Sequence, residues 1–228
     1  MGEVDASDGL GCPHAPAAVL RLLAHRKQAE LRCEPVHADQ GVARPQSPLL
    51  LPQNLQAYSD IGEVCRSEVI FVAVPHQFVS ETLKNMSPHV AKDTIVVSLA
   101  KGLMIKEEGP ELISELIADL LPLETEVAVL MGANVATDVA KDEFVEASIA
   151  CKDNDIANLV KSLVHRSTFH IDMVTHEVST VELCGALKNI IALGAGLCDG
   201  LGVGASTKAA IIRQGMSEMV RFCALYSS

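Results

Sequence analysis

The sequence predicts an α/β fold with a mainly parallel sheet, followed by a helical region. Three apolar runs, at residues 69–74, 94–99 and 127–131, have the length and composition of buried strands. Segments of helical periodicity separate these runs, and such alternation is typical of right-handed βαβ units. From about Thr175 the pattern stays helical to the last residue, which predicts a second, all-helical domain.

The first part of the sheet region can be assigned element by element. A short helix is expected at 60–67, before the first strand, and another at 77–83, after Pro75 ends that strand. Gly109 and Pro110 are expected to open a third helix. Proline favours the first helical turn, and apolar residues follow it at helical spacing.

The second part of the sheet region continues the alternation. A fourth strand is expected at 146–151 and a helix at 153–166 with apolar residues on one face. At 169–173 apolar and polar residues alternate, which is typical of an edge strand. The sheet-forming domain is therefore expected to span residues 53–174 and the helical domain residues 175–228.

Residues 1–52 differ in composition from the rest of the chain. They hold six of the ten prolines and no strand-like run. One amphipathic helix is expected at 17–32. A transit peptide is an alternative interpretation, but the six acidic residues in the segment count against it. We expect residues 1–52 to be poorly ordered and unrelated to the domain that follows.

Composition excludes several classes of function. The net charge of −11, without a basic block, argues against nucleic acid as the main partner. The seven cysteines are odd in number and none has CxxC spacing, so free thiols in a reducing compartment are expected and no metal site. No apolar run is long enough to span a membrane except the helix at 181–200, which Lys188 and Asn189 interrupt.

That glycine-rich helix at 181–200 is the most informative segment. It is apolar on every side and is therefore expected to be buried. Burying a lysine lowers the stability of the fold by roughly several kcal/mol unless the ammonium group is paired or binds a ligand. Small residues surround Lys188 at helical spacing. These residues leave room for an anionic or carbonyl ligand. Alternatively, Lys188 reaches solvent or pairs with Glu182 or Asp199.

Three predicted strands end in distinctive turns. The first is followed by Pro75-His76-Gln77-Phe78, the second by Ala100-Lys101-Gly102, and the third by Gly132-Ala133-Asn134. Each turn alone is also explained by proline or glycine ending a strand. Because ligands of open α/β sheets bind beyond the carboxyl ends of the strands, the three turns together predict one ligand site.

Four segments together resemble one protein family. They are VPHQF at 74–78, AKGL at 100–103, LMGAN at 130–134 and CGALKNIIALGAGLCDGLG at 184–202. The chain resembles the NAD-dependent glycerol-3-phosphate dehydrogenases of the cytosolic eukaryotic type, from about residue 53 to residue 225. The resemblance implies an incomplete Rossmann-like, doubly wound parallel sheet followed by a truncated all-helical substrate domain.

The resemblance also implies a reaction and its residues. The family transfers hydride reversibly between NADH and dihydroxyacetone phosphate, giving glycerol 3-phosphate. By motif, Lys188 corresponds to the catalytic lysine that protonates or polarises the carbonyl oxygen. Lys101 corresponds to the strand-end lysine that contacts the substrate, and Asn189 would help to shape the same pocket. Two ammonium groups beside a developing alkoxide stabilise it electrostatically.

The cofactor side of the site follows from the same resemblance. Phe78 and Ala136 correspond to positions that contact NAD, and Asn134 would contribute to the same pocket. The chain lacks the strand–GxGxxG–helix motif that would hold the pyrophosphate. The family further implies a homodimer in the cytosol, with no metal.

The chain departs from the family pattern in three places. Residues 1–52 stand where the opening βαβ unit is expected, the segment at 203–206 reads VGAS, and the chain stops at Ser228 before the family's catalytic aspartate and phosphate-binding arginine. We therefore expect weak activity from this chain alone. The alternative is a non-catalytic truncated form that pairs with an intact subunit. A β-hydroxyacid or prephenate-type dehydrogenase is a third interpretation, against which PHQF and DGLG count.

Overall fold

The computed structural model describes residues 20–23, 55–107 and 109–226. The chain divides into two compact units, residues 1–60 and 61–228. In the first unit, β1 (Leu20–Leu23) and β2 (Leu55–Tyr58) form a parallel pair. The prediction of a helix at 17–32 is therefore wrong for residues 20–23, because pairing with a distant strand overrides a local helical pattern. The rest of that expectation lies outside the described residues.

The second unit contains a five-stranded sheet, and the expected α/β fold is confirmed. The strand order is β3 (Val69–Val72), β4 (Ile95–Ser98), β7 (Ala128–Gly132), β8 (Val145–Cys151) and β9 (Phe169–Thr175). The pairs β3–β4, β4–β7 and β8–β9 are parallel, and β7–β8 is antiparallel. Between β7 and β8 lies only the short helix α4 (Ala136–Ala140), after which the chain returns along β7. The sheet is therefore mainly parallel.

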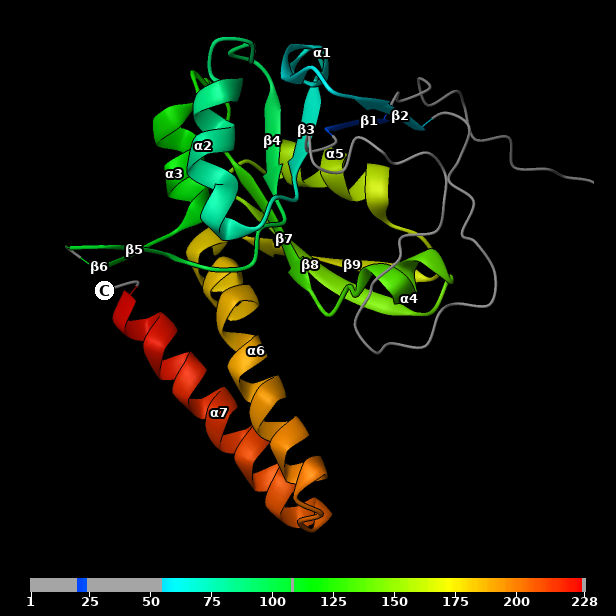
Figure 1. Ribbon diagram of the computed structural model, residues 1–228, viewed down its shortest axis with the longest axis vertical. Helices are drawn as coiled ribbons and strands as arrows, with labels where there is room; N and C mark the ends of the chain where they lie inside the picture. The colour runs from blue at the N-terminus through cyan, green and yellow to red at the C-terminus, as the bar shows by residue number, and fades with distance from the viewer. Residues whose placement is uncertain (1–19, 24–54, 108, 227–228) are drawn as a thin grey trace, which may run out of the picture. The chain divides into compact units, whose positions relative to one another are not determined.

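Helices cover both faces of this sheet (Figure 1). The helices α2 (His76–Met86) and α3 (Ile113–Leu120) pack on one face, and α5 (Asn154–Val164) packs on the other. A short helix, α1 (Ile61–Cys65), precedes β3. Strand β4 shows how the two layers form: Val96 contributes to the core beneath α2 and α3, whereas its neighbour Val97 contributes to the core beneath α5.

The helix expected to open at Gly109 and Pro110 begins later. Residues Gly109–Glu111 form β6, which pairs antiparallel with β5 (Met104–Lys106). Gly109 has a φ of +131°, which lies outside the helical region, and proline is tolerated in an isolated two-stranded ribbon of this kind. A hydrogen bond from Lys106 to Glu111 joins the two strands. Helix α3 starts only at Ile113.

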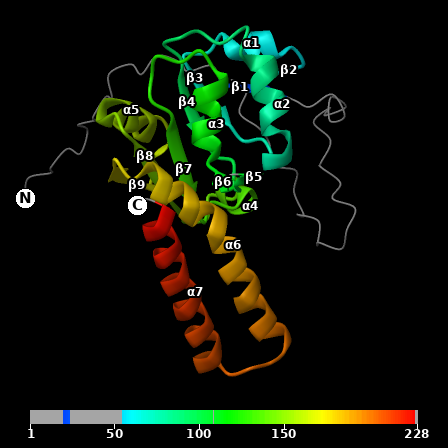
Figure 2. The same cartoon turned by 90° about the vertical axis from the view of Figure 1, so that its left-hand side faces the viewer.

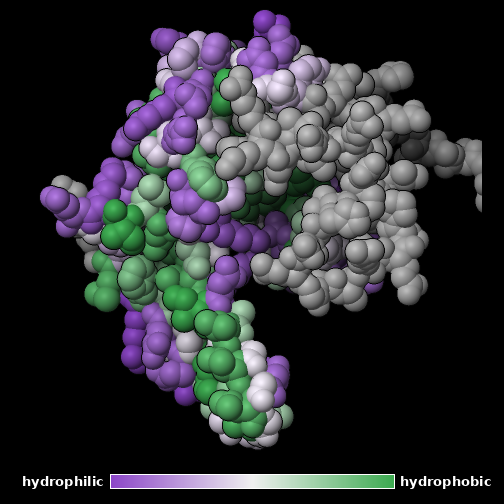
Figure 3. Space-filling model, viewed as in Figure 1, coloured by the Kyte–Doolittle hydropathy of each residue, from purple (hydrophilic) through white to green (hydrophobic). Residues whose placement is uncertain are grey.

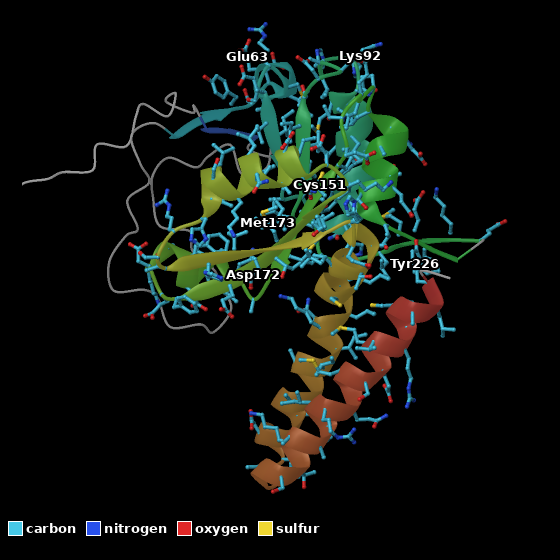
Figure 4. The ribbon with its side chains drawn as sticks, turned by 180° about the vertical axis from the view of Figure 1, so that it is seen from behind. Glu63, Lys92, Cys151, Asp172, Met173 and Tyr226 are labelled. Carbon is cyan, nitrogen blue, oxygen red and sulfur yellow. The ribbon has the colours of Figure 1, made fainter. Side chains whose placement is uncertain are left out.

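The helical pattern after Thr175 is confirmed. Helices α6 (Val178–Gly200) and α7 (Ala205–Tyr226) form a hairpin, in which they lie side by side (Figures 1 and 2). The start of α6 packs on β7, β8 and β9. The end of α7 meets the β5–β6 hairpin, where the Tyr226 hydroxyl donates to the Pro110 carbonyl at 3.4 Å (Figure 4).

The expectation that α6 is buried on all sides is wrong for its second half. Four apolar side chains at helical spacing, which we call the α6 stripe, are 58–78% exposed: Ile190, Leu193, Leu197 and Leu201. Figure 3 shows apolar side chains gathered along this hairpin. By length and composition alone α6 could cross a membrane, a test that core helices of soluble proteins also pass.

A close approach of α6 to β7 depends on Gly185. A Cβ at this position would lie 2.9 Å from the Met131 Cβ and 2.7 Å from its sulfur. We therefore expect Gly185→Ala to lower the free energy of unfolding by about 1–3 kcal/mol, because β7 and α6 must separate. Gly196→Ala on the same helix is the matched control, since nothing lies within 4 Å of a Cβ there. It should leave stability unchanged or raise it by up to about 1 kcal/mol in urea denaturation. Equal effects of the two substitutions would contradict the packing argument.

Candidate functional site

The carboxyl ends of β3 and β4 and the turn after β7 border one cleft. These three strands are neighbours and parallel, so their ends lie at the same edge of the sheet. The cleft has a volume of about 400 Å³ and is lined by residues 73–76, residues 99–101 and Asn134. The three turns that the sequence singled out therefore border a common space.

Lys101 and Asn134 are joined directly. The Lys101 ammonium donates a hydrogen bond of 3.0 Å to the Asn134 side-chain oxygen. Lys101 follows β4 and Asn134 follows β7, so this contact links two adjacent strand ends across the cleft. The ammonium keeps two further donors for a ligand, and its side chain is exposed to solvent.

Lys188 reaches the same edge of the sheet from α6. Its ammonium donates to the carbonyl oxygen of Gly132, the last residue of β7. The side chain is half-buried, and this burial lowers the pKa of Lys188 below its usual value. The positive charge of Lys101 lowers that pKa further. Two ammonium groups thus act on one small region, which suits the binding of an anion or the protonation of a carbonyl oxygen.

The two acidic partners considered for Lys188 are engaged elsewhere. Glu182 is fully buried and accepts hydrogen bonds from the backbone N–H groups of Ile113 at 2.7 Å and Ser114 at 3.1 Å. Its carboxylate therefore caps the start of α3. Asp199 accepts from Lys208 at 2.7 Å. Burial raises the pKa of Glu182, against the lowering effect of its hydrogen bonds with Ser114 and Ile113.

Among the described residues, four predicted ones do not line the cleft: Lys188, which lies at the same sheet edge, and Phe78, Ala136 and Asn189. Phe78 is 45% exposed on the first turn of α2. Ala136 is exposed at the start of α4, and Asn189 is exposed on α6 although it follows Lys188 in sequence. His76, to which the sequence assigned no role, does line the cleft. Its place directly after Pro75 at a strand end was the only available signal.

No group of three potential metal ligands occurs in the part of the chain that the structure describes. The polar groups at this strand edge are two ammonium groups, the Asn134 amide, the His76 imidazole and the Gly132 carbonyl oxygen. Such a set binds and polarises oxygen atoms of an organic ligand.

Comparison with known proteins identifies a family. A family model for the N-terminus of NAD-dependent glycerol-3-phosphate dehydrogenase matches residues 37–157, and one for its C-terminus matches residues 177–228. The cytoplasmic glycerol-3-phosphate dehydrogenase [NAD(+)] of Rattus norvegicus is 44% identical over 179 residues, and that of Homo sapiens is 42% identical. Each alignment covers 78% of this chain and 50% of the relative, so the chain spans about half the length of these curated relatives.

Solved structures agree with the sequence comparison. A glycerol-3-phosphate dehydrogenase of Plasmodium falciparum is 36% identical with a TM-score of 0.72, covering 78% of this chain and 50% of that one. The enzyme of Dunaliella salina is 41% identical with a TM-score of 0.71, covering 76% of this chain and 30% of that one. These structures share the α/β sheet and the helices that follow it. The chain therefore belongs to the NAD-dependent glycerol-3-phosphate dehydrogenase family.

Proposed function

We propose that this chain carries part of an active site that interconverts dihydroxyacetone phosphate and glycerol 3-phosphate with NAD. The observation that carries the proposal is the meeting of Lys188 and Lys101 at the ends of β7 and β4. A phosphorylated ketone presents both an anion and a carbonyl oxygen, and two ammonium groups match these features.

The cleft fits part of a dinucleotide. It lies beyond the carboxyl ends of parallel strands, where such ligands bind in open α/β sheets. We assign contacts with the cofactor to Phe78, Ala136 and Asn134, by their positions in the family motifs. When bound, the reduced nicotinamide supplies the hydride.

Residues of this chain donate the proton to the carbonyl oxygen and stabilise the negative charge that develops on it. We assign to Lys188 the donation of a proton to the carbonyl oxygen, because burial and Lys101 lower its pKa and so make it a better acid. Lys101 stabilises the negative charge that develops on that oxygen and orients Asn134. Asn189 is assigned to the substrate side of the pocket by its place in the motif. In the reverse direction Lys188 accepts the proton.

Domain organisation and surroundings belong to the same proposal. We place a partial dinucleotide-binding domain at 53–174 and the start of a helical substrate domain at 175–228, supported by the two family models that match separate segments. The N-terminal family model begins at residue 37, inside the segment 1–52, so we propose that residues 1–36 stand outside both domains. The curated relatives are named cytoplasmic, which supports a cytosolic location. We propose that α6 does not span a membrane, because ionisable side chains are costly inside a bilayer and the helix contains Glu182, Lys188 and Asp199.

The test is the oxidation of NADH by the purified chain, followed by absorbance with and without dihydroxyacetone phosphate. We expect turnover that requires the substrate and saturates with it. A folded, soluble protein without substrate-dependent turnover would overturn the proposal that this chain is catalytic. Omission of the substrate controls for unspecific NADH loss.

A second candidate function is favoured by the exposed α6 stripe. Its apolar side chains have no cover among the described residues, and such surfaces mark protein interfaces. We propose as occupant an intact glycerol-3-phosphate dehydrogenase subunit, of which the aligned part of this chain covers 50%. Co-expression with a tagged intact subunit should yield a stable hetero-oligomer, and Leu193→Glu should abolish it. Recovery of a homodimer of this chain instead would support the family's expected homodimer and contradict the second candidate.

A further inference from the structure

Two cysteines face each other where α6 packs against α7. The Sγ atoms of Cys184 and Cys223 are 3.9 Å apart. Cys184 is half-buried and Cys223 is 6% exposed, and both lie in a small apolar cluster with Leu112 and Leu183. Both are free thiols in this structure. The contact joins residues that are 39 positions apart in sequence.

A short movement would bring these sulfur atoms to bonding distance. A disulfide has an S–S bond of about 2 Å and forms between residues whose side chains already point at each other. The sulfur atoms must therefore approach by roughly 2 Å, which rotation about the two Cα–Cβ bonds can supply. One helix turn away on α6 lies Lys188, at position i+4 from Cys184.

We propose that Cys184 and Cys223 are a redox site. The two cysteines form an intramolecular disulfide by exchange with a small-molecule disulfide such as oxidised glutathione. The thiolate of the more exposed Cys184 attacks one sulfur of the oxidant, giving a mixed disulfide and one released thiol. Cys223 then loses its proton and attacks the Cys184 sulfur, which releases the second thiol. The protein loses two electrons and two protons, and the oxidant is reduced to two thiols.

The link would tie α7 to α6 near the candidate catalytic lysine. Cys223 lies in the last turn of α7, so the bond would hold that end of the helix in place. A cross-link across this loop is expected to raise the midpoint of thermal unfolding by about 5–10 °C. It would also protect α7 against proteases that cleave the opened hairpin.

The reaction is expected to be slow at neutral pH. Burial, and after it the neighbouring Cys223, raise the pKa of Cys184 to about 11. Only a small fraction of the thiol is then ionised, and the thiolate is the attacking form. The experiment therefore uses overnight incubation at about pH 8.5.

The test compares the folded chain before and after oxidised glutathione, by mass spectrometry of tryptic peptides. Trypsin separates Cys184 (peptide 167–188), Cys198 (189–208) and Cys223 (222–228). We expect a linked pair of peptides 167–188 and 222–228, about 2 Da lighter than their sum, together with the higher unfolding midpoint.

Three variants and one control sharpen the result. Cys184→Ser and Cys223→Ser should each abolish the linked peptides and the shift in midpoint. Cys198→Ser, another buried cysteine of α6, should keep both. Oxidation of the chain in guanidinium chloride should spread the cross-links over several cysteines. Separate alkylation of Cys184 and Cys223 after oxidation of the folded wild-type chain, or an unchanged midpoint after cross-linking, would overturn the proposal.

Discussion

Replacing Lys188 by alanine is expected to lower the rate of NADH oxidation with dihydroxyacetone phosphate about 1,000-fold, or to background. Lys188 is the half-buried ammonium at the end of β7, and its lowered pKa suits proton donation. Loss of a general acid typically costs about 10²–10⁴ in rate, and loss of a charge that stabilises an oxyanion is of similar size. Lys84→Ala, at an exposed position in the last turn of α2, should leave the rate unchanged. Similar rates for the Lys188 variant and the wild type would remove Lys188 from the mechanism.

Lys101→Met separates the charge effect from the proton transfer. It removes the positive charge that lowers the pKa of Lys188 and breaks the hydrogen bond to Asn134. The protonated form of Lys188 should then persist to higher pH, so the alkaline limb of the rate profile should move upward. The rate itself should fall less than with Lys188→Ala. An alkaline limb that does not move, or moves downward, would show that Lys101 does not act on Lys188.

The buried strands were predictable because their burial on both faces leaves continuous apolar runs. The three runs at 69–74, 94–99 and 127–131 correspond to β3, β4 and β7. The strands that could not be predicted from the sequence are those that form through pairing with another strand and lack a distinctive composition of their own. Strand β1 exists through its pairing with β2, and β6 through its pairing with β5. Short paired segments carry too little periodic pattern to be recognised locally.

The site was predictable in part for a similar reason. Parallel strands bring their carboxyl ends to one edge, so Lys101 and Asn134 could be placed together before their hydrogen bond was known. The contact of Lys188 with the Gly132 carbonyl was not predictable. It requires α6 to approach β7 closely at Gly185, which is a property of three-dimensional packing. The partner of Glu182 escaped prediction because it lies 69 residues away, at the start of α3.

Replacing Glu182 by alanine is expected to lower the free energy of unfolding by about 3 kcal/mol. The carboxylate is fully buried and satisfies the N–H groups of Ile113 and Ser114. Without it these buried donors have no acceptor, and each such loss costs about 1–3 kcal/mol. Urea denaturation of folded variants gives the change. Glu115→Ala is the matched control, because that carboxylate at the same helix start is exposed, and it accepts from Leu112 N–H and from the Tyr226 hydroxyl, each at 3.2 Å. Its loss should be about 1 kcal/mol or less, and an equal loss in the two variants would contradict the role assigned to burial.

Glu182→Gln keeps an acceptor oxygen for both N–H groups but removes the charge, so its effect should depend on pH. Burial raises the pKa of Glu182 in the folded state above its ordinary value of 4.5. The protonated folded form is therefore favoured, and this contribution to stability is complete below about pH 4.5 and is lost as the pH rises through the raised pKa. The free energy of unfolding of the wild type, relative to that of the glutamine variant, should fall between about pH 4.5 and the raised pKa and should not change at higher pH. Unfolding free energies of the two proteins between about pH 4 and pH 8 measure the difference. If the wild type instead gains on the variant as the pH rises, the N–H groups of α3 stabilise the carboxylate more than burial penalises it, and the cap is an anion site instead of a neutral hydrogen-bond partner.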